Sequence, residues 1–319
     1  MITVICPVYN EEHYIKNVID FFLPAMPVEK ELIIIDGGST DKTRQIILEY
    51  MSSNSNIKIL ENTGRFVPFA LNKAIQSSEG DPIIRLDAHT VYADDYFTSI
   101  VSAFQKTGAD IVGGPMRAVG ATPFQKAVAI ATSTSFGIGD SSFHDENYEG
   151  YVDSVYLGAW KRSVFKDVGF FDEDMLRNQD DEFHYRAKSK GKKIYLDPRI
   201  KSYYSPRSTF SSLFKQYFQY GLFKPLVLKK VKSEMKLRHL IPSGFVLYLF
   251  LILIFCKTPL IFIPLCIYLL LDILFSFRKG GALHVSMCML LVYPALHCSY
   301  GAGFIKGTLL LWIGTKPKI

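Results

Sequence analysis

The chain has 319 residues but only five cysteines, and their spacing argues against two common kinds of stabilising cross-link. The C-x-x-C spacing typical of zinc sites and redox motifs is missing, and the number of cysteines is odd. Four of the five lie within apolar runs toward the C-terminus. We therefore expect neither a disulfide framework nor a structural zinc site.

The sequence also lacks a strong excess of one charge, because 36 Lys and Arg residues stand against 30 Asp and Glu residues. Much of the net charge of +6 comes from residues 224–239, where several basic side chains accompany Glu234 alone. A nucleic-acid-binding surface would interleave aromatic and basic residues or carry a known motif, and neither occurs here. Since an apolar run follows, the segment is more typical of a juxtamembrane linker that faces anionic lipid.

Long apolar runs are concentrated after residue 239. Residues 240–256 carry no charged side chain, and residues 259–277 carry only Asp272. As helices they would reach roughly 25–29 Å, enough to cross a hydrocarbon core of about 30 Å. A third stretch, 282–312, contains Pro294 and Lys306, so it fits either one span near 283–304 with a helix lying on the membrane or a broken pair. We predict a membrane region at 240–319 with two or three spans.

Two features predict the orientation of these spans. Basic residues favour the cytoplasmic side, which places both the 224–239 segment and the Arg278-Lys279 loop there, with the chain crossing out and back between them. The N-terminus shows no charged and apolar leader, because Met1 runs directly into an apolar strand pattern. We therefore expect a multi-pass protein of the inner (cytoplasmic) membrane whose N-terminal domain is cytoplasmic.

Before residue 220, short apolar runs alternate with helical periodicity. Strands are predicted at residues 2–6, 32–35, 57–60, 83–86, 111–114 and 193–196. Asn10 is expected to cap the first helix, and residues 115–150 are expected to mix helix and loop. Continuous apolar runs indicate a parallel sheet covered on both faces. The predicted fold class is therefore α/β, an open sheet whose ligands bind outside the carboxyl ends of its strands.

Carboxylates follow two of these strands, at Asp36 and in Asp87-Ala88-His89. Residues i and i+2 of an extended segment point the same way, so Asp87 and His89 are placed to grip one divalent cation. Carboxylate and imidazole together suit Mn²⁺, and carboxylate alone suits Mg²⁺. The alternative is an ordinary turn in which the aspartate caps nearby backbone and the histidine faces solvent.

Four motifs, taken together, resemble those of the inverting glycosyltransferases of family two, which have the GT-A fold. They are Pro7-Val8-Tyr9-Asn10-Glu11-Glu12, Asp36-Gly37-Gly38-Ser39-Thr40-Asp41, Asp87-Ala88-His89 and Asn178-Gln179-Asp180-Asp181-Glu182. The Leu86–His89 variant and the apolar tail are most similar to bacterial exopolysaccharide glycosyltransferases of the succinoglycan type. The resemblance implies a Rossmann-like nucleotide-sugar-binding domain at 1–220, a basic linker at 221–239 and the membrane region at 240–319.

The resemblance also implies which residues bind the donor. The nucleotide-sugar site would consist of Pro7, Tyr9, Glu11, Asp36, Arg65 and Asp87. Asp36 would accept a hydrogen bond from uracil N3–H, which suits a carboxylate because uracil offers one N–H between two carbonyls. Arg65 would contact the pyrophosphate, although an ordinary surface arginine is an equal alternative. Asp87 and His89 match a metal-binding triplet that usually ends in a second aspartate, so His89 would either ligate the cation or touch the ribose or phosphate.

For the acceptor side, Asp180 matches the family's catalytic base, which takes the proton of the acceptor hydroxyl. The adjacent Asp181 is a second candidate, whereas Glu182 and Arg186 are expected to pair on one helix face. Trp160 matches the acceptor-side loop and would stack on a sugar ring, unless it is a core aromatic. The Arg-Trp pair with which longer processive synthases close their site is missing, which favours transfer of a single sugar.

These interpretations predict an inverting hexosyltransferase that moves one sugar from a UDP-sugar to a hydroxyl of a lipid-linked glycan, in exopolysaccharide or cell-surface polysaccharide synthesis. A divalent cation, Mn²⁺ or Mg²⁺, is the expected cofactor, and other polysaccharide-assembly proteins are candidate partners. One alternative is a polyprenyl-phosphate sugar synthase, whose ionised phosphate acceptor needs no base. Another is a non-catalytic nucleotide-binding scaffold of a polysaccharide complex.

Overall fold

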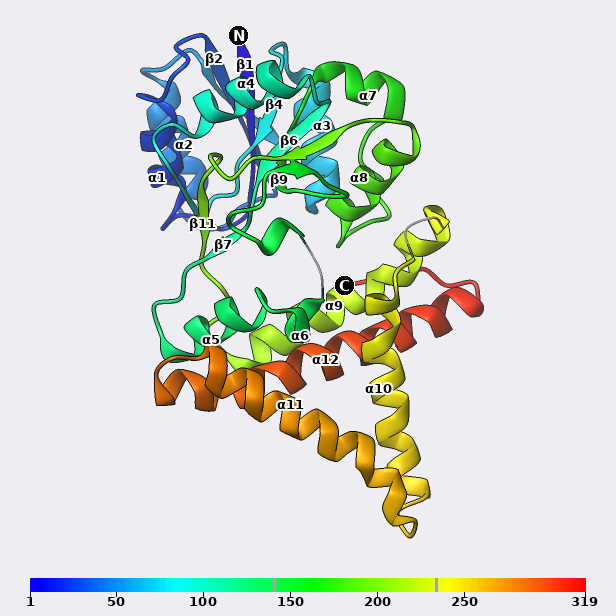
Figure 1. The fold of residues 1–319 in the computed structure, drawn as a ribbon. Coiled ribbons are helices and arrows are strands. Elements are labelled where there is room, and N and C mark those ends of the chain that lie inside the picture. The colour runs from blue at the N-terminus through cyan, green and yellow to red at the C-terminus, as the bar shows by residue number, and fades with distance from the viewer. Residues whose placement is uncertain (140–141, 233–234) are drawn as a thin grey trace. The chain divides into compact units, whose positions relative to one another are not determined.

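The computed structural model describes residues 1–139, 142–232 and 235–319, and the chain divides into two compact units (Figure 1). Unit 1 comprises Met1–Arg117 and Ser142–Tyr204, and unit 2 comprises Ala118–Ser141 and Ser205–Ile319. The predicted boundary at residue 220 thus differs from the observed one. The sequence pattern also does not indicate that Ala118–Ser141, which lies between the two parts of unit 1 along the chain, belongs to unit 2. Residues 140–141 of the 115–150 segment and 233–234 of the predicted linker lie outside the described residues.

All six predicted strands are present, and further strands accompany them. The strands are β1 (Ile2–Val8), β2 (Lys30–Asp36), β3 (Ile57–Glu61), β4 (Ile83–Arg85), β5 (Thr90–Tyr92), β6 (Ile111–Gly114), β7 (Arg117–Ala118), β8 (Gly150–Tyr151), β9 (Tyr156–Trp160), β10 (Ile194–Leu196) and β11 (Ser202–Tyr204). The helices of unit 1 are α1 (Ile15–Phe22), α2 (Thr43–Met51), α3 (Val67–Ser77), α4 (Tyr96–Thr107), η1 (Ser142–His144), α7 (Arg162–Val168) and α8 (Gln179–Ser189).

Eight of the described strands form one mixed sheet in the order β3-β2-β1-β4-β9-β6-β10-β8. β1 pairs in parallel with both β2 and β4, and β2 pairs in parallel with β3. β9 runs antiparallel between β4 and β6. Every residue of β2 is buried, as predicted for a parallel strand that is covered on both faces.

Helices cover both faces of this sheet, and Figure 1 shows α1 and α2 on one side with α7 and α8 on the other. Apolar residues of α1, α2 and α4 form one core, and those of α3, α7 and α8 form a second. In α1 the buried residues are Ile15, Val18, Ile19 and Phe22, the spacing of an amphipathic helix with one apolar stripe. The layered α/β fold predicted from the sequence is therefore confirmed.

The strand order reverses direction between β1 and β4. The chain moves outward from β1 to β2 and β3, and it then returns to place β4 on the other side of β1. In open α/β sheets, the crevice outside the carboxyl ends of the strands at such a reversal is where ligands bind. The loops after β1 and β4 both leave the sheet at this point, and they contain two of the recognised motifs.

Unit 2 is helical in its described part. Its elements are α5 (Pro123–Ala131), α6 (Ser135–Ile138), α9 (Phe210–Lys230), α10 (Leu237–Ile254), η3 (Pro259–Phe262), α11 (Ile263–Lys279) and α12 (Leu283–Trp312). The helices α9 and α12 lie side by side, as Figure 1 shows. Glycines allow this close approach, since a Cβ added at Gly221 would lie 2.1 Å from the Tyr300 carbonyl oxygen and one at Gly303 would lie 2.1 Å from that of Phe218.

Within the part of unit 2 that the structure describes, three helical stretches are long and apolar enough to cross a membrane: Leu237–Ile254, Pro259–Lys279 and Leu283–Trp312. The first two correspond to the predicted spans at 240–256 and 259–277. The third is one continuous helix that passes through Pro294, so the predicted interruption does not occur. A single proline removes only one N–H donor from a helix, so a long helix can continue through it. Packing against α9, α10 and α5 also stabilises α12.

Candidate active site

A pocket opens beyond the carboxyl ends of β1 to β4. Its wall is formed by Pro7, Val8, Tyr9, Glu11, Ile35, Asn62, Arg65, Val67, Ala70, Arg85, Asp87, Ala88 and His89. The structure thus brings together most of the residues that the sequence singles out for the nucleotide and the metal. The end of β1 and the loops after β1, β3 and β4 supply them, and they meet because the strand order reverses at β1 and β4.

The loops after β1 and β2 are held to each other by hydrogen bonds. Asn10 Oδ1 accepts from the backbone N–H of Thr40 at 2.8 Å, and Asp41 Oδ2 accepts from that of Glu12 at 3.1 Å. The prediction that Asn10 caps the first helix is wrong, because α1 begins only at Ile15 and Asn10 adopts the left-handed conformation with φ 55°. Its side chain instead fixes the segment that presents Tyr9 and Glu11 to the pocket.

Asp36 ends β2 and is almost fully buried. Its Oδ1 accepts hydrogen bonds from the backbone N–H and the hydroxyl of Ser39, at 3.0 and 2.6 Å. Its Oδ2 is buried as well, and among the described residues it accepts no hydrogen bond. An unsatisfied buried carboxylate oxygen is costly, so a donor group that reaches it would be bound favourably. Asp36 lies next to Ile35 of the pocket wall.

Asp87 lies in the turn between β4 and β5 rather than in an extended segment. Tyr92 holds the turn, because its hydroxyl accepts from the backbone N–H of Asp87 at 2.7 Å and donates to the carbonyl of the same residue at 3.1 Å. His89 occupies the same turn, and its Nδ1 lies 3.7 Å from Glu11 Oε1. Asp87 and His89 therefore face one pocket, although the turn places them there and not the alternation of a strand.

Arg85, the last residue of β4, links the two carboxylates that the motifs single out. Its Nε and Nη2 donate to Asp87 at 2.9 and 3.3 Å, and its Nη1 donates to both oxygens of Asp180 at 2.9 and 3.0 Å. Its side chain is 7% exposed, whereas those of Asp87 and Asp180 are 20% and 31% exposed. From the sequence we assigned Arg85 no role. The one feature of the sequence that could have indicated a role is the position of this charge at the end of an apolar run.

Asp180 and Asp181 lie in the first turn of α8, which begins after Asn178. The N-terminal end of a helix favours negative charge, so this turn stabilises ionised carboxylates. Burial nevertheless raises the pKa of the Asp180 carboxyl above its ordinary value, and the charges of Asp87 and Asp181 act in the same direction. The guanidinium of Arg85 opposes them and lowers this pKa.

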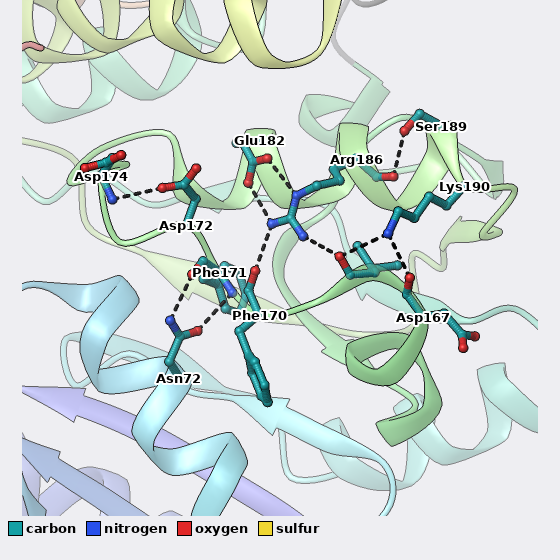
Figure 2. Close-up of polar contacts among 11 residues, drawn as sticks. Asn72, Asp167, Phe170, Phe171, Asp172, Asp174, Glu182, Arg186, Ser189 and Lys190 are labelled. Atoms are coloured by element: carbon teal, nitrogen blue, oxygen red, sulfur yellow. Dashed lines mark hydrogen bonds and ion pairs between the residues drawn. The ribbon is translucent and has the colours of Figure 1, made fainter.

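The segment before α8 is fixed by polar contacts, which Figure 2 shows. Arg186 pairs with Glu182 at 2.7 Å, as predicted, and also donates to the carbonyl of Phe170 at 2.9 Å. Asn72 of α3 exchanges two hydrogen bonds with the backbone of Phe171, at 2.8 and 2.9 Å. These contacts anchor the helix that carries Asp180 to the rest of unit 1.

Trp160 does not have the role that the resemblance suggested. It is fully buried at the end of β9, where its register partners are Ile83 and Ile111. Its ring packs edge-on against those of Phe171 and Phe183, with centroids 5.6 and 6.3 Å away. The prediction that Trp160 stacks on an acceptor sugar is therefore wrong, and the alternative of a core aromatic holds.

The chain is similar in sequence and in fold to known proteins. The sequence profile of the family described as Glycosyl transferase family 2 matches residues 3–169, a little over half of the chain. The chain belongs to this family. The match covers the loops after β1, β2, β3 and β4, and it ends before α8.

Two relatives of this family 2 glycosyltransferase cover most of its length. The "Succinoglycan biosynthesis protein ExoA" of Rhizobium meliloti is 32% identical over 75% of this chain and 73% of that protein. The "Dolichyl N-acetyl-alpha-D-glucosaminyl phosphate 3-beta-D-2,3-diacetamido-2,3-dideoxy-beta-D-glucuronosyltransferase" of Methanococcus voltae is 30% identical over 96% of each chain.

Solved structures share the fold of this family 2 enzyme at low sequence identity. The mannosyltransferase PcManGT from Pyrobaculum calidifontis, in complex with GDP-Man and Mn²⁺, has a TM-score of 0.61 at 15% identity over 96% of this chain and 86% of that one. Residues 1–349 of S. aureus TarS, in complex with UDP-GlcNAc, have a TM-score of 0.55 at 16% identity over 99% and 93%. The predicted GT-A fold is confirmed by these matches.

Proposed function

We propose that this glycosyltransferase transfers one sugar, with inversion, from a UDP-sugar to a hydroxyl group of a lipid-linked glycan at the cytoplasmic face of the membrane. The observation that carries the proposal is the position of Asp180. It presents a carboxylate at the start of α8 and is joined through Arg85 to Asp87 at the pocket wall. A pocket for the donor with a base beside it is the arrangement that an inverting displacement needs.

In this reaction the acceptor oxygen attacks the anomeric carbon while the nucleoside diphosphate leaves from the opposite face. The hydroxyl proton must leave as the new bond forms, and we assign Asp180 to accept it, with Asp181 as the second candidate. Burial raises the pKa of Asp180, which makes it a stronger base than an aspartate in water. An α-linked donor then gives a β-linked product.

We assign the nucleotide to the part of the pocket near β1 and β2. Pro7, Tyr9 and Glu11 line it, and the buried Oδ2 of Asp36 is the acceptor that uracil N3–H requires. Arg65 lies on the same wall and is exposed, so it is placed to meet the negative charge of a diphosphate. The choice of a UDP-sugar rests on Asp36, since the structural neighbours were solved with different nucleotide sugars, UDP-GlcNAc in TarS and GDP-Man in PcManGT.

The residues present also fit a divalent cation that is shared with the substrate. Asp87 and His89 reach the pocket wall, and a carboxylate with an imidazole suits Mn²⁺, whereas the carboxylate alone suits Mg²⁺. In residues 1–139, 142–232 and 235–319 no group of three or more His, Cys, Asp or Glu side chains gathers for a metal, so substrate oxygens would complete the shell. When bound, the cation would neutralise charge on the departing diphosphate. The Mn²⁺ complex of PcManGT supports this assignment.

For the acceptor, the names of the two relatives point to related chemistry. One is a succinoglycan biosynthesis protein, and the other acts on a dolichyl N-acetylglucosaminyl phosphate. The three helices long enough to cross a membrane would keep this chain beside a lipid-borne acceptor. We therefore place the reaction in exopolysaccharide or cell-surface polysaccharide synthesis, with other assembly proteins as candidate partners.

The test is UDP release and sugar transfer by the full-length protein in detergent, with UDP-, GDP- and dTDP-sugars and a membrane lipid extract, in Mn²⁺ or in EDTA. We expect turnover that needs both lipid and metal, and that is lost in Asp87→Ala and Asp180→Asn. Asp167→Asn is the matched control, because that aspartate is half-exposed on α7 and pairs with Lys192 outside the pocket. Binding of UDP without turnover for any donor would contradict the proposal and support the scaffold alternative.

Asp180→Asn also separates the proposal from a polyprenyl-phosphate sugar synthase. A phosphate acceptor is already ionised, so that reaction needs no base and the variant would be nearly silent. A hydroxyl acceptor needs the base, so we expect a loss of at least about a hundredfold in kcat.

A further inference from the structure

Arg85 is buried at the centre of the candidate site, and neither the motifs nor the family match gives it a function. Its guanidinium donates to two carboxylates, that of Asp87 two residues along the chain and that of Asp180 on α8. Placing an arginine in a nearly buried position has a desolvation cost that only well-formed pairs offset. The cost of burying Arg85 indicates that this residue has a functional role.

We propose that Arg85 is a positioning residue for the reaction, which holds the Asp180 carboxylate in register with Asp87 and keeps it ionised. The inference rests on the proposed function, because it takes Asp180 as the base. It adds a residue that acts through Asp180 and not on the substrate itself.

The geometry supports the positioning role. A guanidinium is planar and rigid, so contacts with two carboxylates fix both their separation and their orientation. One carboxylate belongs to the turn after β4, at the donor pocket, and the other to α8, on the acceptor side. Arg85 is therefore a direct link between the part of unit 1 that would hold the donor and the part that would hold the base.

The charges around Asp180 support the second half of the role. The groups that face it are Arg85 on β4, Asp87 in the following turn and Asp181 on its own helix, and Tyr156 of β9 lies near Arg85. Arg85 is the one cation among these protein groups, and the divalent cation proposed at Asp87 would add positive charge only when bound. In the metal-free protein, like charges and burial would therefore both favour protonation of Asp180 if Arg85 were removed. A protonated carboxyl group cannot take the proton of the acceptor.

The experiment compares the pH dependence of kcat/KM for the wild type, Arg85→Met and Arg85→Lys. We expect Arg85→Met to lose on the order of a hundredfold in kcat at pH 7. Its acid limb should move to higher pH by about one unit or more, so that its activity relative to wild type recovers as the pH rises. Arg85→Lys keeps the charge but not the planar fork, so it should restore the limb and only part of kcat.

Arg199→Met is the matched control, since Arg199 also binds a buried aspartate, Asp197, through both carboxylate oxygens. It should leave the acid limb in place. An acid limb that Arg85→Met does not move, or that Arg199→Met moves equally, would overturn the proposal.

A second measurement needs no turnover, so it decides the matter even if the proposed reaction fails for every donor. It is the thermal stability of the full-length protein in detergent between pH 4.5 and 7.5. If Arg85 keeps Asp180 ionised, Arg85→Met raises the pKa of the Asp180 carboxyl in the folded protein further above its value in the unfolded chain. The variant therefore loses more stability than wild type as the pH rises. Asp180→Asn in the same background should remove most of that difference, and parallel pH profiles for wild type and Arg85→Met would overturn the proposal.

Discussion

The carboxylate of Asp36 and the guanidinium of Arg44 lie 3.6 Å apart, with Asp36 1% exposed and Arg44 52% exposed. Arg44 approaches from the solvent side, and the distance is that of an ion pair and not of a hydrogen bond. The buried charge is therefore balanced while Oδ2 keeps its capacity to accept a hydrogen bond.

Asp36→Asn tests this capacity. The amide oxygen can keep the bonds to Ser39, which would leave the amide nitrogen facing the uracil N3–H, donor against donor. We expect UDP to bind about tenfold more weakly or worse, because a lost hydrogen bond in a buried site costs roughly 1–3 kcal/mol. Isothermal titration with UDP measures it, and Asp167→Asn should bind UDP normally. Unchanged affinity in Asp36→Asn would remove Asp36 from the base-binding site.

The pH profile distinguishes the two adjacent carboxylates. Because the pKa of Asp180 is raised, the acid limb of kcat/KM should lie at a higher pH than an ordinary aspartate gives, and activity should fall as the pH falls through it. Asp180→Asn should abolish transfer, whereas Asp181→Asn should keep it and shift the limb slightly to lower pH, since one negative neighbour is lost. The opposite pattern would make Asp181 the base.

The glycine contacts between α9 and α12 can be tested by adding a single methyl group. Gly303→Ala would place a Cβ 2.1 Å from the Phe218 carbonyl oxygen, so the helices must move apart. We expect a loss of about 1–3 kcal/mol in unfolding free energy, measured by thermal unfolding in detergent. Gly244→Ala on α10 is the control, because nothing lies within 4 Å of its added Cβ and alanine favours a helix. Equal stability of the two variants would contradict the observed packing.

Cys256 reports on the crossing of the membrane. It is exposed between the end of α10 at Ile254 and the start of η3 at Pro259. If α10 and α11 run out and back, a membrane-impermeant maleimide should label a variant with Cys256 as its only cysteine in spheroplasts. A variant with its only cysteine at position 279, made by Lys279→Cys, should be labelled only after lysis. Labelling of Cys256 that also requires lysis would show that the helices do not cross in this way.

The sequence predicted most of the pocket because its signals are local. An apolar run that ends in Asp36 or in Asp87-Ala88-His89 marks the carboxyl end of a buried strand, and an open α/β sheet gathers such ends. Residues that depend on tertiary pairing were harder to predict. Arg85 looks like any charge at a strand end until α8 brings Asp180 to it from far along the chain.

The errors have a similar origin. Trp160 follows Gly158-Ala159 as a loop residue would, but pairing of β9 between β4 and β6 buries it. The boundary at 220 was misplaced because α9 has an amphipathic pattern that suits either unit. The packing of α9 on α12, through Gly221 and its neighbours, places α9 in unit 2.

Residues 118–141 belong to unit 2, and this determines where the chain can be cut to obtain a separate catalytic fragment. Their helix α5 contributes Ala127, Val128 and Ala131 to a core whose other walls come from α9 and α12. Truncation after Tyr204 would therefore strip α5 of its partners and expose an apolar surface on the remaining fragment. A soluble catalytic fragment needs two cuts, one after Tyr204 and one that replaces residues 118–141 with a short polar linker.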